Sequence, residues 1–222
     1  MKKFEIHLHT NFSKCSNNKP EDVLKKAKIL GLNGIAITDH NTIDGALKVK
    51  ELNKDKNFEV IIGEEINSNI GHILVYYLKK SISPGNIKDI LKEAKKQGAV
   101  VVLAHPYNIL SSIMTKIFKI KNLRGTIDPE NEVIKEFNGI EVFNSRYLFK
   151  KEIELSRKLA ERYKKTAVAG SDAHFLSEVG NSLVLFEDKY TLKEAILKNK
   201  IKYYGKKRFP VFNRFKSFLR TR

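Results

Sequence analysis

The stretch that organises this sequence is Lys2–Thr10, which reads KKFEIHLHT. Its apolar residues alternate with charged residues and histidines, which is the two-residue period of a β-strand. In such a strand His7 and His9 lie on the same face, about 7 Å apart along the backbone. Two imidazoles held in this way can bind one metal ion between them; the alternative is a pair of surface histidines on an edge strand.

Beyond this first strand, apolar runs and helical patterns alternate along the chain. Further strands are expected to begin near residues 34, 59, 71, 99, 139, 166 and 182. Helical patterns separate most of them, at about residues 20–30, 43–53, 84–98, 131–137, 149–164 and 191–199. The alternation predicts a parallel sheet with right-handed crossovers, and the number of units in 222 residues favours a closed α/β barrel over an open sheet.

The six histidines follow the strand ends of this predicted barrel. Five lie at or just past the end of a strand, and His72 begins a strand that follows a tight turn; the five are His7, His9, His40, His105 and His174. In an α/β barrel the carboxyl ends of the strands share one rim, where the chemistry of such folds gathers. The histidines are therefore predicted to meet at that rim.

Imidazole nitrogens and carboxylates on one rim are the donors that Zn²⁺, Mn²⁺ or Fe²⁺ selects. The candidate carboxylates are Glu65 or Glu64, Asp172 and Asp39. These are too many ligands for one four-coordinate ion, so two or three divalent ions with a bridging carboxylate are expected. Ions about 3.5–4 Å apart can clamp a phosphate and lower the pKa of a shared water towards 7.

Composition sets the remaining bounds. The hydrophobic fraction of 41% and the charged fraction of 30% are those of a globular protein, and the single cysteine, Cys15, indicates a reducing cytoplasm without disulfides. The longest apolar run, residues 99–104, is too short to span a membrane, and no signal peptide is expected. A net charge of +17 predicts phosphorylated or polyanionic partners, although a general lysine preference explains it nearly as well.

Six spaced motifs give a resemblance to a known family. They are His7-Leu8-His9-Thr10, Thr38-Asp39-His40-Asn41-Thr42, Gly63-Glu64-Glu65-Ile66, Gly71-His72-Ile73-Leu74, Ala104-His105-Pro106 and Gly170-Ser171-Asp172-Ala173-His174. In this order they resemble the PHP (polymerase and histidinol phosphatase) family, over roughly residues 1–190. The resemblance implies a distorted (β/α)₇ TIM-like barrel with a two- or three-metal site that hydrolyses phosphoesters through a metal-bound hydroxide.

The resemblance also implies a ligand set. One ion would be held by His7, His9, Glu65 and Asp172; Glu65 would bridge to a second ion that is also held by His72 and His105; a third would use His40 and His174. Glu65 matches the family position because it stands two residues after Gly63, and Asp39 is expected to orient a ligand imidazole.

Two positions depart from the family pattern. The family commonly begins Asp-Leu-His, whereas Glu5 stands at the first position here. The loop after the first strand reads Ser13-Lys14-Cys15, where the family usually supplies an acid or a histidine. The third ion is then weak or absent, or Cys15 replaces the missing ligand. Lys14 and Arg146 are candidate contacts for substrate phosphate.

The sequence predicts a barrel domain over residues 1–200, with residues 109–127 as a lid or a passive insertion beside the rim, and a basic, phenylalanine-rich tail over 201–222 that docks on the barrel or binds nucleic acid. The expected function is a cytoplasmic metal-dependent phosphoesterase acting on a phosphomonoester, a nucleotide or a nucleic-acid end. One alternative is a catalytically weak metal-binding module that the tail recruits to nucleic acid. Another is an amidohydrolase-type metallohydrolase.

Overall fold

The computed structural model describes residues 1–108, 128 and 131–206, whose strands form one nine-stranded sheet in the order β7-β6-β5-β4-β3-β2-β1-β8-β9. The strands are β1 (Lys2–Glu5), β2 (Gly34–Ile37), β3 (Glu59–Ser68), β4 (Gly71–Tyr76), β5 (Val100–Leu103), β6 (Gly139–Asn144), β7 (Thr166–Gly170), β8 (Ser182–Phe186) and β9 (Lys202–Gly205).

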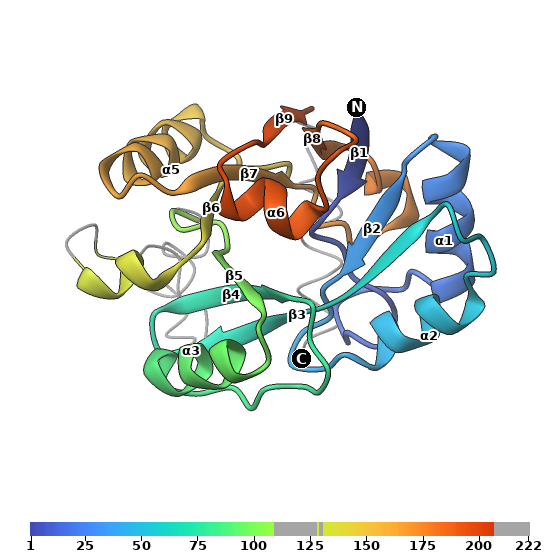
Figure 1. Ribbon diagram of the computed structural model, residues 1–222, viewed down its shortest axis with the longest axis horizontal. Coiled ribbons are helices and arrows are strands. Elements are labelled where there is room, and N and C mark those ends of the chain that lie inside the picture. Colours follow the sequence, from blue (N-terminus) through green and yellow to red (C-terminus); the bar gives the residue numbers. More distant parts are fainter. Residues whose placement is uncertain (109–127, 129–130, 207–222) are drawn as a thin grey trace.

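Helices cover the outside of this curved sheet (Figure 1). They are α1 (Pro20–Ile29), α2 (Asp44–Leu52), α3 (Ile87–Lys96), the 3₁₀ turn η1 (Glu132–Glu136), α5 (Lys150–Arg162), the 3₁₀ turn η2 (Leu176–Glu178) and α6 (Leu192–Leu197). The local chemistry explains their starts: Pro20 occupies the first turn of α1, and the Asn86 side chain accepts the N–H of Lys88 at the start of α3.

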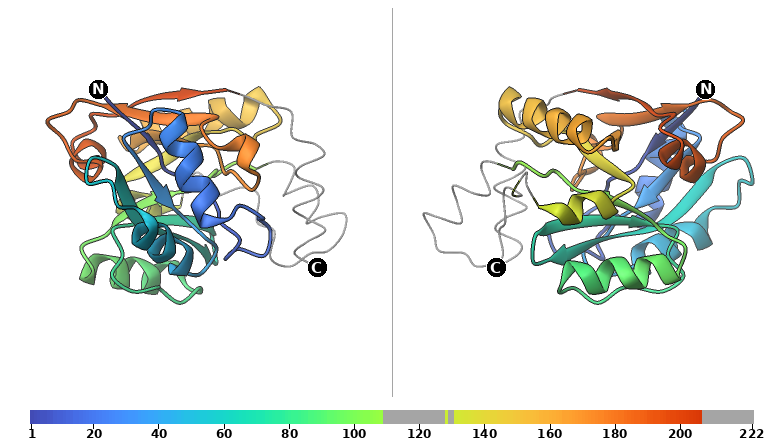
Figure 2. Two further views of the ribbon diagram at one scale, coloured as in Figure 1. Left: turned by 90° about the vertical axis from the view of Figure 1, so that its right-hand side faces the viewer. Right: turned by 60° about the vertical axis from the view of Figure 1, so that its left-hand side comes forward.

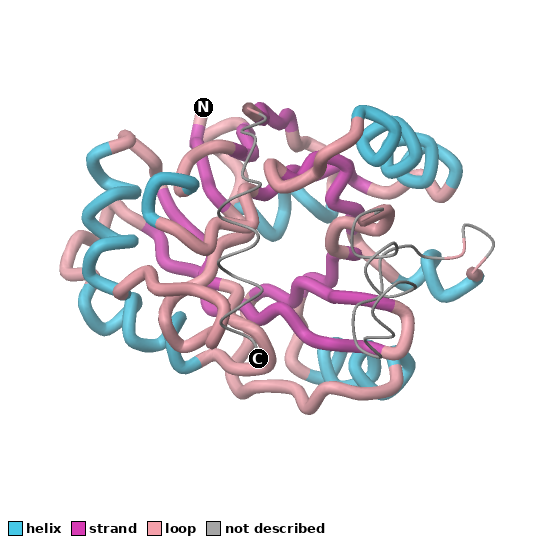
Figure 3. The backbone as a smooth tube through the Cα atoms, turned by 180° about the vertical axis from the view of Figure 1, so that it is seen from behind, coloured by secondary structure: helices cyan, strands magenta, loops and turns pink. Residues whose placement is uncertain are grey.

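The sheet is nearly closed into a barrel, as the sequence predicts, but it is mixed rather than wholly parallel. β1–β2, β2–β3, β5–β6 and β6–β7 are parallel pairs, whereas β4, β8 and β9 run antiparallel to their neighbours. β4 reverses because only two residues separate Ser68 from its partner Gly71, which leaves no room for a crossover helix. Seen from behind, the strands surround the centre of the molecule, and α1, α2, α3 and α5 lie outside them (Figure 3).

The barrel closes where β1 and β7 run on past their paired regions. The N–H of Asp172 donates to the carbonyl of His7 at 2.8 Å, and the N–H of His9 donates to the carbonyl of Ala173 at 2.9 Å. Leu8 and Ala173 thus form a parallel bridge between the first and seventh strands. Residues far apart in the sequence are thereby joined at the carboxyl rim.

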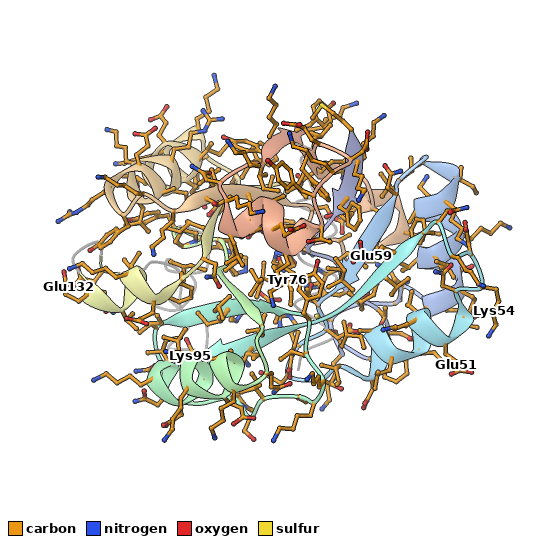
Figure 4. The ribbon with its side chains drawn as sticks, viewed as in Figure 1. Glu51, Lys54, Glu59, Tyr76, Lys95 and Glu132 are labelled. Atoms are coloured by element: carbon orange, nitrogen blue, oxygen red, sulfur yellow. The ribbon has the colours of Figure 1, made fainter. Side chains whose placement is uncertain are left out.

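α6 closes the opposite end of the barrel. Leu192, Ala195 and Ile196 join a buried cluster with inward-facing strand residues such as Phe4 and Tyr76. Figure 4 shows Tyr76 near the centre of the molecule and Lys95 and Glu132 at its periphery. Because this cluster fills the barrel interior, a functional site is expected at the rim at the other end.

The chain between Lys200 and Gly205 differs from the sequence prediction. It was expected to begin a tail, but Lys202–Gly205 forms β9 and pairs with β8. Figure 2 shows β8 and β9 in orange to red, α1 in blue and α3 in green from two further sides. The predicted lid at 109–127 and the tail beyond residue 206 lie outside the described residues.

Candidate metal centre

All six histidines meet at the carboxyl rim of the barrel. Neighbouring imidazole centroids lie 4.4–6.2 Å apart. His7 and His9 follow β1, and His72 joins them from the start of β4 because that strand runs antiparallel. The reversed direction of β4 thus explains why a histidine at a strand start reaches the same rim as histidines at strand ends.

Glu65, within β3, lies at the centre of the cluster and is almost fully buried. Each carboxylate oxygen faces a different set of imidazoles. Oε2 lies 3.2–3.4 Å from the ring nitrogens of three histidines, namely His7, His9 and His40. Oε1 lies 2.9 Å from His72 Nδ1 and 3.0 Å from His105 Nε2. One carboxylate is therefore shared between two groups of donors, which is the geometry a bridging ligand needs.

Asp172 lies across the cluster from Glu65. Its Oδ1 atom lies 3.2 Å from His9 Nε2, 3.6 Å from His7 Nε2 and 3.3 Å from His174 Nδ1. Its backbone has a φ of 54°, in the left-handed region that a non-glycine residue seldom adopts. His105 is similarly unusual, with a φ of 23°. Two rim residues thus hold strained backbone conformations, which concentrate at functional sites.

The donor atoms form three groups in which all atoms lie within 4.8 Å of one another: His7, His9, Glu65 and Asp172; His40, Glu65 and His72; and His9, His40 and His174. Three buried atoms here lack a hydrogen-bond partner among the described residues, namely His7 Nε2, Glu65 Oε2 and His72 Nδ1. Unpartnered buried nitrogen and oxygen atoms in groups that share one carboxylate fit divalent cations.

These groups can be compared with the ligand sets that the resemblance implies. The first group has the same four members as the first predicted set. In the second group His40 stands with Glu65 and His72, while His105 lies on the same carboxylate oxygen as His72. The third group adds His9 to His40 and His174 and contains no carboxylate. The assignment of ligands to individual ions stays a prediction.

Asp39 is buried but reaches the imidazoles indirectly. Its carboxylate accepts hydrogen bonds from the N–H and hydroxyl of Thr10 and from the hydroxyl of Ser13, the last at 2.6 Å. Ser13 Oγ in turn lies 3.5 Å from His9 Nδ1 and accepts the N–H of His40. Because the Ser13 proton is given to Asp39, its oxygen is an acceptor for both histidines. The Ser13 side chain thus links Asp39 to His9.

Lys14 and Cys15, in the loop after the first strand, and Arg146, the other candidate phosphate contact, have different surroundings. Lys14 is exposed, whereas Cys15 is buried and burial raises the pKa of its thiol to about 12. Cys15 joins none of the three donor groups found among the described residues. Arg146 is only 6% exposed; its Nη1 donates to the carbonyl of Asp172 at 3.3 Å and lies 4.0 Å from a Glu178 oxygen. Arg146 therefore braces the strained Asp172 backbone.

Glu64 is buried, and its carboxylate accepts the Ser81 hydroxyl at 2.6 Å and the Ile82 N–H at 3.0 Å. Successive strand residues point to opposite faces, so Glu64 faces away from the cluster that Glu65 enters.

Sequence reasoning missed Glu141, which is fully buried in β6. Its Oε1 atom lies 2.7 Å from His7 Nδ1, and its Oε2 atom accepts the N–H of His105 at 2.9 Å. The available signal was an acid inside an otherwise apolar strand, where an unpaired charge is too costly to be retained without partners.

The metal-free protein is expected to lose stability as pH rises from about 6.5 to 9. Burial lowers the pKa of His9, but the neighbouring carboxylates of Asp172 and Glu65 outweigh this and raise it to about 9. His9 holds its proton more tightly in the folded than in the unfolded protein. The stabilisation that this proton contributes is therefore complete below pH 6.5 and is lost as pH rises through 9. The melting temperature of chelator-treated protein across this range is the measurement; a constant value contradicts the expectation.

Other rim groups do not reverse this trend. Burial lowers the pKa of His40 to about 3 and, together with Arg146 and His9, holds that of His174 well below 6.5. Both stay uncharged in the folded protein above pH 6.5, so the stability that they gain with rising pH comes mainly below this range. Burial raises the pKa of Glu5 to about 7, which acts in the same direction as His9. A bound ion replaces the proton on a ligand nitrogen, so the gain in melting temperature on adding metal should grow with pH.

The site is a histidine and carboxylate centre at the carboxyl rim of an α/β barrel, a class of site built for divalent metal ions. The PHP domain family matches residues 5–211. This chain belongs to the PHP domain family. No described helix is long and apolar enough to cross a membrane.

Several known proteins are similar to this chain in sequence or in fold. An uncharacterised protein of Methanocaldococcus jannaschii is 34% identical over 191 residues, covering 84% of this chain and 71% of that protein. A two-domain protein of Bacteroides vulgatus containing a predicted PHP-like metal-dependent phosphoesterase superposes with a TM-score of 0.74 at 21% identity, over 92% of this chain and 65% of that one. Endonuclease Q, in complex with duplex DNA bearing an abasic lesion, superposes with a TM-score of 0.57 at 15% identity, over 88% of this chain and 56% of that one.

Proposed function

We propose that this chain hydrolyses a phosphate ester with the help of divalent metal ions at the rim cluster. The observation that carries the proposal is the group of His7, His9, Glu65 and Asp172, in which the buried atoms His7 Nε2 and Glu65 Oε2 have no hydrogen-bond partner among the described residues. Such ions supply Lewis acidity and lower the pKa of a bound water towards 7. No free side-chain base is then required.

The chain's own residues divide the work at this centre. His7, His9 and Asp172 would hold the most buried ion, and Glu65 would link it to a second ion near His72 and His105. His40 and His174 would complete a third position, which has no carboxylate of its own. Arg146 donates to the Asp172 carbonyl, which supports a role in shaping the site; its contact with substrate phosphate stays a prediction.

The substrate would approach from the side of His40 and His72. Their side chains are 27% and 30% exposed, whereas those of His7 and His9 are fully buried. Exposed Lys14 is then available to meet a phosphate, and the net charge of +17 favours anionic substrates. The proposed substrate is a phosphomonoester, a nucleotide or a nucleic-acid end. A cytoplasmic location stays a prediction from composition.

Asp172→Ala and His9→Ala are each expected to lower metal content and abolish turnover without unfolding the barrel. Each change removes one donor from the most buried group but leaves the barrel interior intact. The measurement is elemental analysis of protein purified without chelator, combined with hydrolysis of an aryl phosphate in added Mn²⁺. Circular dichroism of each variant serves as the folding control.

The outcomes separate the candidate functions. Two or three ions per wild-type chain with turnover support the phosphoesterase. Full activity in both variants would contradict the assignment of Asp172 and His9 as ligands. Metal binding with background turnover for every metal tried would instead favour the catalytically weak module, for which the lysine in place of an acid at residue 14 is the sequence reason.

A further inference from the structure

Glu141 accepts three hydrogen bonds in a fully buried position. Its Oε1 atom faces His7 Nδ1 at 2.7 Å. Its Oε2 atom accepts the N–H of His105 at 2.9 Å and the side-chain amide of Asn144 at 3.1 Å. The carboxylate thus lies directly behind two rim histidines, on the side away from Glu65.

An ionised carboxylate only accepts hydrogen bonds, so the 2.7 Å contact places a proton on His7 Nδ1. The other ring nitrogen, Nε2, then faces Glu65 Oε2 at 3.4 Å and Asp172 Oδ1 at 3.6 Å. This is the side of the donor group proposed to hold the most buried ion. A ligand imidazole needs its lone pair on that side and its proton on the other.

The bond to the His105 backbone has a separate effect. His105 has a φ of 23°, and the bond from its N–H to Glu141 helps to retain that strained conformation. The ring of His105 then reaches Glu65 Oε1 with Nε2 at 3.0 Å. Asn144 extends the network, since its side-chain amide also lies 3.4 Å from Asp172 Oδ2.

We propose that Glu141 is a positioning residue of the metal centre, which fixes the Nδ1–H tautomer of His7 and the backbone of His105 together. The inference rests on the proposed function, in which His7 is a metal ligand. The buried Glu141 carboxylate, which would not itself contact an ion, would thereby align two histidines. They are His7, in the first donor group, and His105, which lies next to Glu65 Oε1.

Glu141→Gln tests this role because glutamine has the same shape but one acceptor oxygen. The backbone N–H of His105 cannot change, so the amide oxygen is retained on that side and the NH₂ group faces His7 Nδ1. His7 must then give up either the hydrogen bond or its Nδ1 proton. Zn²⁺ affinity, measured by competition with a chromophoric chelator, is expected to fall by about 10–100-fold.

A second readout reports the tautomer itself. Nitrogen-resolved NMR of the Zn²⁺-loaded protein should show a slowly exchanging Nδ1–H signal of His7 in the wild type, absent in Glu141→Gln. Glu152→Gln is the matched control: Glu152 is also fully buried, and its carboxylate accepts the N–H of Phe149 at the start of α5. This control should leave both readouts unchanged.

The outcomes distinguish this role from the function on which it rests. Wild-type protein that binds no Zn²⁺ would overturn the proposed function and the positioning role together. Wild-type binding with an unchanged Zn²⁺ affinity and an unchanged His7 signal in Glu141→Gln would overturn the positioning role alone. An equal loss of affinity in Glu152→Gln would show that buried glutamates act through general stability, which would also overturn it.

Discussion

Glu65→Gln is expected to abolish detectable metal binding and to lower phosphoester turnover by about a thousandfold or more, since the ions contribute several kcal/mol. The two oxygens of Glu65 lie 2.9–3.4 Å from nitrogens of five histidines. Glutamine keeps the shape, but it removes the negative charge and replaces one oxygen by an NH₂ group that cannot act as a ligand. Metal content and aryl phosphate hydrolysis with Mn²⁺ are the measurements.

The neighbouring residue supplies the control for this experiment. Glu64 is buried in the same strand, but its carboxylate accepts the Ser81 hydroxyl and the Ile82 N–H on the opposite face. Glu64→Gln should therefore retain its metal ions and its turnover. If the two variants lost metal equally, the central role of Glu65 would be refuted.

Gly170→Ala is expected to destabilise the fold by about 1–3 kcal/mol and to weaken metal binding at the same time. A Cβ atom at Gly170 would overlap the Glu141 carboxylate and the Cβ atom of His7, neither of which can move without leaving its partner. The hydrogen bond between Glu141 and His7 would be broken or displaced. Urea unfolding of the metal-free protein and Zn²⁺ competition measure the two effects separately.

Gly139→Ala is the matched control, because it also adds a methyl group to a buried strand. Its Cβ would lie 2.9 Å from the Thr166 carbonyl oxygen, near the start of β6 and beside α6, at the end of the barrel remote from the rim. This variant should lose stability but bind Zn²⁺ as the wild type does. A Gly170→Ala protein with wild-type Zn²⁺ affinity would contradict the steric argument.

The position of the rim could be predicted from sequence because it depends on local patterns. Alternation in Lys2–Thr10 and the polar residues after apolar runs place histidines at strand ends, and the fold brings those ends together. The direction of β4 was not predicted, although the turn before it was. A hairpin is a local feature, whereas the neighbours of a strand in the sheet depend on the whole chain.

Two further features escaped prediction for physical reasons. β9 carries Lys202 and follows other lysines, so its composition resembled a solvated tail; its alternating exposure emerges only once it pairs with β8. Glu141 has no motif of its own, and its importance arises from partners 134 and 36 residues away, His7 and His105. Sequence patterns indicate which face of a strand a residue occupies, but not which distant side chain meets it there.

The bridge between Leu8 and Ala173 has a consequence for the order of events in folding. His9 and Asp172 are separated by 163 residues, yet both belong to the most buried donor group. Contacts of such long range form slowly because closing a long loop costs entropy before the contact stabilises it. A ribosome-bound chain that has not yet extruded residue 172 cannot assemble this group. Its first histidines therefore cannot bind an ion as a set until residue 172 has left the ribosome.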